Sequence, residues 1–209
     1  MKSIKIASLS ALLTATCLLS ACSPRTASVD LDRVLDITSQ TLTAFEQEQA
    51  YNNYAENSEV KEDGASLTKT AMNEESMQEF GKQLERNLNR AAPQIHPESI
   101  GVNMSEDGSV QGYNDKNNNG MKDSGEKELF KIEVDGEKQR LLASSGEHVR
   151  DHGFSGSGLL TGLLIGNMLS RQRGAGISPS SLSSKRTVSK SAYKSARTRS
   201  GSGSHSRGK

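Results

Sequence analysis

The sequence predicts an α+β fold in which two amphipathic helices precede two antiparallel β-hairpins. Up to Pro93, apolar residues recur at steps of three or four, the period of a helix. From Ile100 onward they alternate with polar residues, the period of a strand. An Asp-Gly pair, typical of a tight hairpin turn, stands twice between alternating stretches. With 33% hydrophobic and 4% aromatic residues, the chain has material for one small domain.

The first predicted helix runs from Val29 to about Tyr54, with Asp30 and Asp32 suited to its N-terminal turn. The second runs from about Asn73 to Ala92, and Pro93 prevents its continuation. Each has one apolar stripe, so we expect the helices to pack on each other or on a sheet. The stripes comprise Leu31, Val34, Leu35, Thr38, Leu42 and Phe45 in the first helix, and Met77, Phe80, Leu84 and Leu88 in the second.

Two hairpins are predicted after Pro97. The first contains Ile100, Val102 and Met104, turns at Asp107-Gly108, and returns through Val110 to Tyr113. The second contains Phe130, Ile132 and Val134, turns at Asp135-Gly136, and returns from Gln139 to Ala143. The sequence therefore predicts four short strands, with residues 115–126 joining the second to the third.

Residues 1–21 have the pattern of an export signal. Lys2 and Lys5 precede an apolar stretch from Ile6 to Leu19, which is too short to span a bilayer as a helix. Small residues then precede Cys22, as signal peptidases require. Residues 22–28 are expected to form a polar tether, and the small α+β domain is expected at 29–150.

The stretch Leu19-Ser20-Ala21-Cys22 resembles the lipobox of bacterial lipoproteins. The resemblance implies that Cys22 carries the lipid, that cleavage occurs before it, and that the protein is anchored in the cell envelope. Ser23 in place of Asp implies the outer membrane. The chain has two cysteines, Cys17 and Cys22, so the processed protein keeps no thiol for a disulfide or zinc site. The alternative is an ordinary secretory signal followed by a cysteine of no consequence.

A twelve-residue segment from Asp115 to Glu126 matches the pattern D-x-[DN]-x-[DN]-G-x5-E at every position. It places oxygen-bearing side chains at loop positions 1, 3, 5, 9 and 12, with Gly120 at position 6 for a sharp turn. The segment resembles the calcium loop of an EF-hand. The resemblance implies ligands from Asp115, Asn117, Asn119, the Met121 carbonyl, Asp123 and Glu126.

Three departures from the EF-hand pattern are visible. Lys122 stands where paired loops carry an apolar residue, no second loop is found, and the flanking segments read as strands. Three carboxylates are a low count, so we expect a structural calcium site with a dissociation constant on the order of 10⁻⁴ to 10⁻³ M. The alternative is a polar turn that only looks like the pattern.

Charge is divided along the chain. All 25 acidic residues lie between Cys22 and Ser170, whereas residues 171–209 contain ten Lys or Arg and no acid. This Ser-, Gly-, Arg- and Lys-rich tail has no apolar period and is expected to be disordered. Its cations would attract lipid headgroups or lipopolysaccharide, or fold back on the acidic body. Tyr193 is its one aromatic residue, so no nucleic-acid partner is expected.

A Gly-rich apolar segment at 151–170 precedes the tail. Gly158, Gly162 and Gly166 recur every fourth residue, which resembles a glycine zipper. Its apolar stretch from Leu159 to Leu169 is too short to span a bilayer, which leaves packing on the domain, membrane contact or self-association.

No arrangement of residues predicts catalysis. No nucleophile–base order or phosphate loop is present, and His148 and His152 alone make a poor metal site even on a helix. We therefore expect a non-enzymatic, lipid-anchored envelope protein that acts as a binding or structural module stabilised by calcium. The alternative is an envelope adaptor that grips anionic surfaces through its basic tail and glycine repeat.

Overall fold

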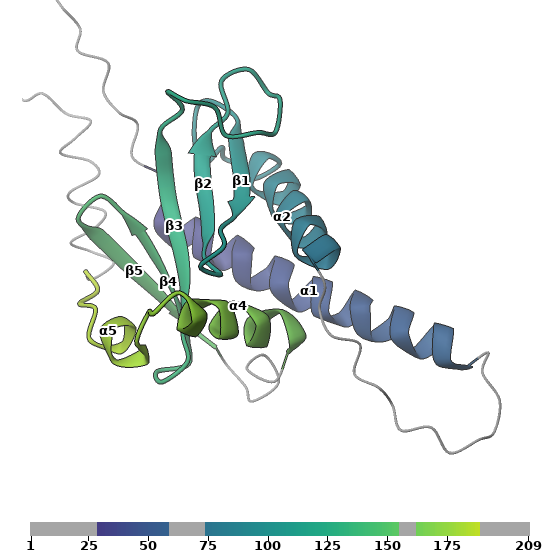
Figure 1. The fold of residues 1–209 in the computed structure, drawn as a ribbon. Helices are drawn as coiled ribbons and strands as arrows, with labels where there is room; N and C mark the ends of the chain where they lie inside the picture. Colours follow the sequence, from purple (N-terminus) through teal and green to yellow (C-terminus); the bar gives the residue numbers. More distant parts are fainter. Residues whose placement is uncertain (1–28, 59–73, 155–161, 189–209) are drawn as a thin grey trace, which may run out of the picture.

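The computed structural model describes residues 29–58, 74–154 and 162–188, except the side chains of 53–58. The helices and strands form one α+β arrangement (Figure 1). They are α1 (Leu31–Ser58), α2 (Glu74–Asn89), β1 (Ile100–Met104), β2 (Val110–Asn114), β3 (Glu128–Asp135), β4 (Arg140–Ser145), β5 (His148–Gly153), α4 (Leu163–Gly174) and α5 (Pro179–Ser183).

The strands form one antiparallel sheet in the order β1-β2-β3-β4-β5 (Figure 1). The prediction of an α+β fold with two helices before antiparallel strands is confirmed. The prediction of two separate hairpins is corrected, because β2 pairs with β3 and a fifth strand follows β4. The fifth strand has no apolar alternation to reveal it. Instead, Arg150 on β5 pairs with Asp32 of α1 at 2.6 Å, so a polar strand is held against the helix.

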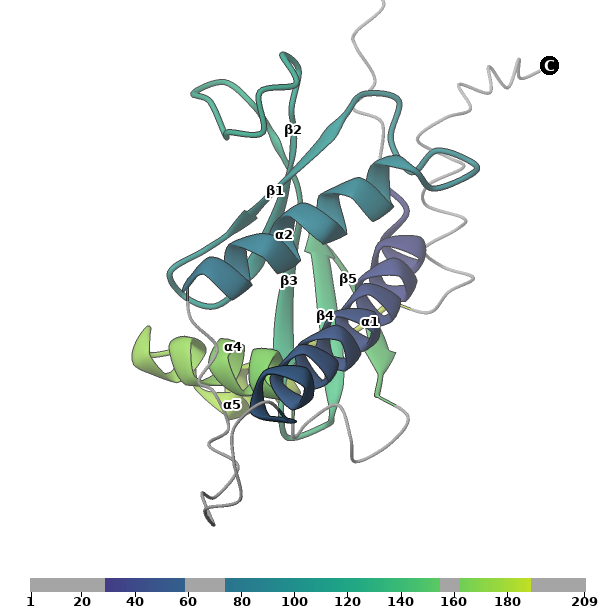
Figure 2. The same cartoon turned by 90° about the vertical axis from the view of Figure 1, so that its right-hand side faces the viewer.

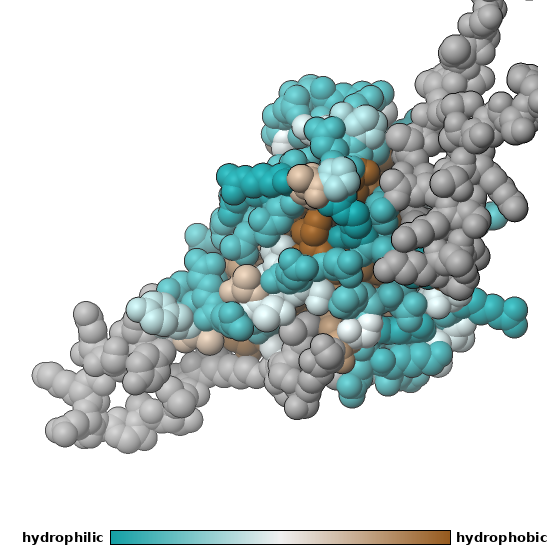
Figure 3. Space-filling model, turned by 180° about the vertical axis from the view of Figure 1, so that it is seen from behind, coloured by the Kyte–Doolittle hydropathy of each residue, from teal (hydrophilic) through white to brown (hydrophobic). Residues whose placement is uncertain are grey.

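Helices α1 and α2 lie side by side against one face of the sheet (Figure 2). Both predicted stripes are buried there, and the Phe45 and Phe80 rings meet edge to face with centroids 5.6 Å apart. From the sheet, Phe130, Ile132 and Val134 of β3 join the same core. The face opposite to that of Figure 1 is mostly hydrophilic around a small apolar patch (Figure 3), as expected for helices with single stripes.

Two glycines in the sheet make room for aromatic rings on the neighbouring strand. Gly112 lies opposite Phe130, and a Cβ added at Gly112 would lie 2.2 Å from the Phe130 Cζ atom. Gly101 lies opposite Tyr113, whose Cζ would lie 2.3 Å from such a Cβ. These glycines are therefore required by the close approach of the rings, which cover the backbone that a glycine leaves open.

Helix side chains complete the hydrogen bonding of strand backbones. On the β1 edge, Asn89 of α2 accepts from the Ile100 N–H at 2.9 Å and donates to its carbonyl at 2.8 Å. Gln172 of α4 binds Val134 of β3 in the same two-way manner, with both distances 2.9 Å. Strand β2 pairs no further than Ile132, so Gln172 satisfies backbone groups that β2 leaves without a partner.

Part of the expected disordered tail is ordered. Helix α4 lies across the end of the sheet that carries the Asp107-Gly108 and Asp135-Gly136 turns, and α5 follows it (Figure 1). Leu164, Ile165 and Met168 enter the core, and Leu182 of α5 is buried. The domain boundary expected at residue 150 and the disorder expected from residue 171 are therefore wrong for residues 163–188. Residues 189–209 lie outside the described part of the chain.

Ion pairs and hydrogen bonds, as well as buried apolar side chains, hold residues 163–188 against the domain. Arg171 pairs with Glu74 of α2 at 2.5 Å, and Lys185 pairs with Glu133 of β3. The N–H groups of Leu163 and Leu164 donate to the carboxylate of Glu46 in α1, which caps the start of α4. The basic and glycine-rich composition suggested a solvated tail. These cations and N–H groups instead bind carboxylates of residues that are far away in the sequence.

Of the alternatives left open for the glycine repeat, packing on the domain is what the structure shows for residues 163–169. A Cβ added at Gly162 would lie 2.4 Å from Glu46 Oε1. Glycine at this position therefore makes room for the Glu46 carboxylate that caps α4, and packing against a second chain is not needed to explain it. Gly166 is exposed with open space around it, and Gly158 lies outside the described residues.

Candidate metal loop

The segment from Asp115 to Glu126 connects β2 to β3 and projects beyond the sheet, at the end opposite α4 (Figure 1). This confirms that it joins the second strand to the third. Its base is closed by the Asn114 N–H, which donates to the Lys127 carbonyl at 3.0 Å. The Asp115 N–H donates to the Ser99 carbonyl at 3.0 Å, which fixes the first predicted ligand to the segment before β1.

The Asp115 carboxylate organises the first half of the loop. Its two oxygens accept from the Asn119 N–H at 3.1 Å and the Gly120 N–H at 2.9 Å. The chain turns inside this clamp because Asn118 and Gly120 adopt positive φ angles of 56° and 69°. Asp115 is 5% exposed, so its carboxylate points into the loop and not into solvent.

Asp123 accepts hydrogen bonds from both asparagines that are predicted ligands. The Asn117 and Asn119 amide groups donate to its Oδ2 atom at 2.8 Å and 3.0 Å. Their own carbonyl oxygens accept from the N–H groups of Asn119 and Met121 at 3.2 Å and 2.8 Å. Three predicted ligands therefore lie within hydrogen-bond reach of one another.

Glu126 ties the end of the loop to its beginning. Its oxygens accept from the Lys116 N–H and the Asp123 N–H, both at 3.0 Å. The structure thus brings Asp115, Asn117, Asn119, Asp123 and Glu126 into one hydrogen-bonded loop. The Met121 side chain is 66% exposed, as suits a residue that the pattern uses only for its carbonyl.

The donors are all oxygens, the ligand type that calcium prefers. Within the described part of the chain, no three side chains of His, Cys, Asp or Glu gather closely enough to hold a metal by themselves. A cation in this loop would therefore depend on the asparagine oxygens and the backbone carbonyl together with the carboxylates. That mixed set is chemically suited to a hard cation bound weakly.

The charge of the loop affects the ionisation of Tyr113, which stands two residues before Asp115. Burial, followed by the nearby carboxylates of Glu85, Asp115 and Glu126, raises the pKa of Tyr113 to about 12. Each of these effects disfavours the phenolate, since burial removes water and the carboxylates repel a negative charge. The Tyr113 phenol is therefore a natural reporter of the charge in the loop.

Sequence reasoning missed the residues beneath the loop. The Asn114 amide donates to Glu98, and its Oδ1 is buried without a hydrogen-bond partner among the described residues. Glu98 and Ser99 lie between Pro97 and the first strand, where the sequence shows no pattern that points to the loop. Only the pairing of β1 with β2, Ile100 opposite Asn114, brings them there.

The two histidines do not form a metal site together. His148 and His152 lie at opposite parts of β5, so their backbones are separated by roughly 13 Å at about 3.3 Å per residue. His152 contacts Asp36 of α1 through Nδ1 at 3.1 Å. His152 therefore belongs to the contact between β5 and α1.

Comparison with known proteins finds no matching family model, no similar curated protein and no similar solved structure. The class that fold and site define is thus a five-stranded antiparallel sheet, covered by two helices, with a polar twelve-residue loop at one end. None of the helices in residues 29–58, 74–154 and 162–188 has the length and apolar character needed to cross a bilayer.

Proposed function

We propose that this protein is a lipid-anchored, non-enzymatic component of the bacterial cell envelope whose Asp115–Glu126 loop binds calcium. One observation supports calcium above all: the five predicted side-chain ligands converge in one closed loop. Asp115 holds the turn, Asp123 holds both asparagines, and Glu126 joins the loop's two ends.

The negative charge of the loop favours the binding of a cation. The loop carries three carboxylates, and each of them accepts hydrogen bonds from N–H or amide donors within the loop. Bound calcium would supply positive charge at their centre.

The consequence would be structural. The loop bridges β2 and β3 and is tied to Ser99 before β1, so ordering it would stiffen three strand ends at once. Its residues are largely exposed, which fits a site that fills at millimolar calcium. The protein would then be reinforced where calcium is plentiful.

Calcium is expected to raise the melting temperature of the full chain carrying Cys22→Ser, which removes the lipid but leaves the domain intact. At about 10 mM calcium and a dissociation constant of about 10⁻⁴ to 10⁻³ M, the gain is about 1.4 to 2.7 kcal/mol. Calorimetric melting with calcium or chelator measures it. Binding should also lower the pKa of Tyr113 from about 12, which an absorbance titration of tyrosinate detects.

The control variants separate the loop from general ion effects. Asp115→Ala with Glu126→Ala should abolish both responses, whereas Glu106→Ala, an exposed acid in the β1–β2 turn, should leave them intact. Identical melting curves for the parent protein with calcium and with chelator would rule out the proposed site.

The anchor proposal rests on Leu19-Ser20-Ala21-Cys22, which lies outside the described residues. We expect the parent chain to incorporate labelled palmitate and to sediment with membranes, and Cys22→Ser to incorporate none; equal labelling of the two chains would rule out the anchor. Because Cys22→Ser keeps the uncleaved apolar segment from Ile6 to Leu19, its sedimentation tests the alternative, attachment to anionic surfaces by the basic tail, only by comparison with a chain that lacks the tail. A chain ending at Val188 then decides whether residues 189–209 hold it there.

Fewer groups remain available for the alternative, an adaptor that binds anionic surfaces through the basic tail and the glycine repeat. Within the described residues, Arg171 and Lys185 are engaged by Glu74 and Glu133, and the apolar side of α4 is in the core. An adaptor function would therefore depend on the other cations of the tail, six of which lie after Val188.

A further inference from the structure

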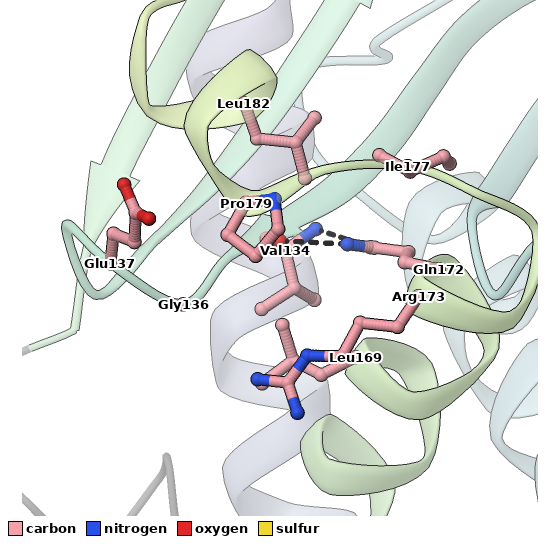
Figure 4. Close-up of a pocket in the computed structure, with 9 residues that line it drawn as sticks. All are labelled: Val134, Gly136, Glu137, Leu169, Gln172, Arg173, Ile177, Pro179 and Leu182. Atoms are coloured by element: carbon pink, nitrogen blue, oxygen red, sulfur yellow. Dashed lines mark hydrogen bonds between the residues drawn. The ribbon is translucent and has the colours of Figure 1, made fainter.

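A cavity of about 430 Å³ lies between α4, α5 and the β3–β4 turn (Figure 4). Its volume falls within the range of about 300 to 1,000 Å³ that is usual for small-molecule sites. Most of its wall is apolar, from Val134, Leu169, Ile177, Pro179 and Leu182. Only the folding of residues 163–188 onto the sheet creates this cavity.

The floor offers no free hydrogen-bonding group from Gln172. Both ends of its carboxamide are taken by the Val134 backbone, as the dashed lines in Figure 4 show. A sugar, nucleotide or other ligand with many polar groups would lose its hydrogen bonds to water there without replacement. This part of the cavity therefore favours an alkyl chain.

One unpaired cation stands at the opening. The Arg173 side chain passes Leu169 and places its guanidinium beside the apolar wall, whereas the Glu137 carboxylate points away from it (Figure 4). Among the residues that the structure describes, the Arg173 guanidinium makes no hydrogen bond or ion pair. Arg140, Arg150 and Arg171 each bind a carboxylate.

We propose that this cavity binds a single-chain anionic amphiphile of the fatty-acid class. The alkyl chain would lie against the five apolar side chains, and the headgroup would receive charge-assisted hydrogen bonds from Arg173. The site is independent of the calcium loop, which lies at the other end of the sheet.

Calorimetric titration of the full chain carrying Cys22→Ser tests the proposal, with laurate as the probe below its micellar concentration. Lysophosphatidylglycerol in a second arm distinguishes a phospholipid from a free fatty acid as the source of the chain. Dodecylammonium, with the same chain and the opposite charge, should bind more weakly than laurate, because Arg173 repels it.

Arg173→Glu is expected to weaken laurate binding about tenfold or more, since it replaces a charge-assisted hydrogen bond by repulsion. Ile177→Trp should abolish binding by filling the cavity. Arg90→Glu, an exposed charge reversal after α2, should bind as the parent does. Absence of laurate binding, or equal affinity in Arg173→Glu and Arg90→Glu proteins with unchanged melting temperatures, overturns the proposal.

Discussion

A chain that ends at Arg150 is expected to lose cooperative unfolding, whereas a chain that ends at Val188 keeps it. The shorter chain lacks Leu164, Ile165, Met168 and Leu182, all at most 3% exposed in the structure. Burying each such side chain stabilises a fold by about 1.5 to 3 kcal/mol. Their combined loss is comparable to the whole stability of a small domain, about 5 to 15 kcal/mol.

Polar contacts add to this effect. Without Gln172, the Val134 N–H and carbonyl lose the carboxamide that binds them, and without α4 the Glu46 carboxylate loses two N–H donors. The Arg140 guanidinium also loses the Ser183 and Lys185 carbonyls.

Urea unfolding followed by circular dichroism compares the two truncated chains with the full chain. The chain ending at Val188 serves as the matched control, since it removes residues 189–209 and leaves α4 and α5 in place. Equal midpoints for the chains ending at Arg150 and Val188 would show that residues 151–188 add nothing to the core.

Replacing Arg140 is expected to cost about 3 to 5 kcal/mol of unfolding free energy, because it leaves a buried carboxylate without its cation. The partner is Asp135, which is 0% exposed and accepts from Arg140 Nε at 2.8 Å. Burial alone lowers the pKa of Arg140, but its hydrogen bonds to Asp135 and Asp151 outweigh this and raise it. The guanidinium thus remains charged beside Asp135 at neutral pH.

Arg140→Met keeps an unbranched apolar stem and removes the guanidinium with its charge. Adding Asp135→Asn should recover part of the loss, because a neutral amide tolerates burial better than an unpaired carboxylate. Asp151→Asn alone should cost little, since Asp151 is 33% exposed and the Asp135 pair remains. Urea midpoints of the four proteins measure these differences; a loss for Arg140→Met no larger than that for Asp151→Asn would contradict the proposed role of the pair.

These two expected losses exceed the gain expected from calcium. The core of the sheet is buried, whereas the candidate metal loop is largely exposed and held by its own hydrogen bonds. Calcium would therefore adjust the stability of strand ends in a domain that already has a core.

The local patterns of the sequence determined much of the fold. Helical steps placed the stripes of α1 and α2, because a helix brings every third or fourth residue to one face. Alternation and the two Asp-Gly turns placed β1 to β4 for a similar local reason. The twelve-residue loop pattern likewise placed five oxygen-bearing side chains that the structure brings together, since a turn of that length is closed by its own side chains.

Only the tertiary structure decided where β5 and residues 163–188 lie in the domain. Arg150, Arg171 and Lys185 look like solvated charges in the sequence, yet their partners Asp32, Glu74 and Glu133 stand far from them along the chain. A prediction from composition considers only the apolar surface that a stretch can bury by itself. These stretches instead bury apolar surface against a sheet and helices formed by other residues. The cavity beside Arg173 and the supports beneath the loop at Glu98 and Ser99 arise in the same way, from contacts that no local period encodes.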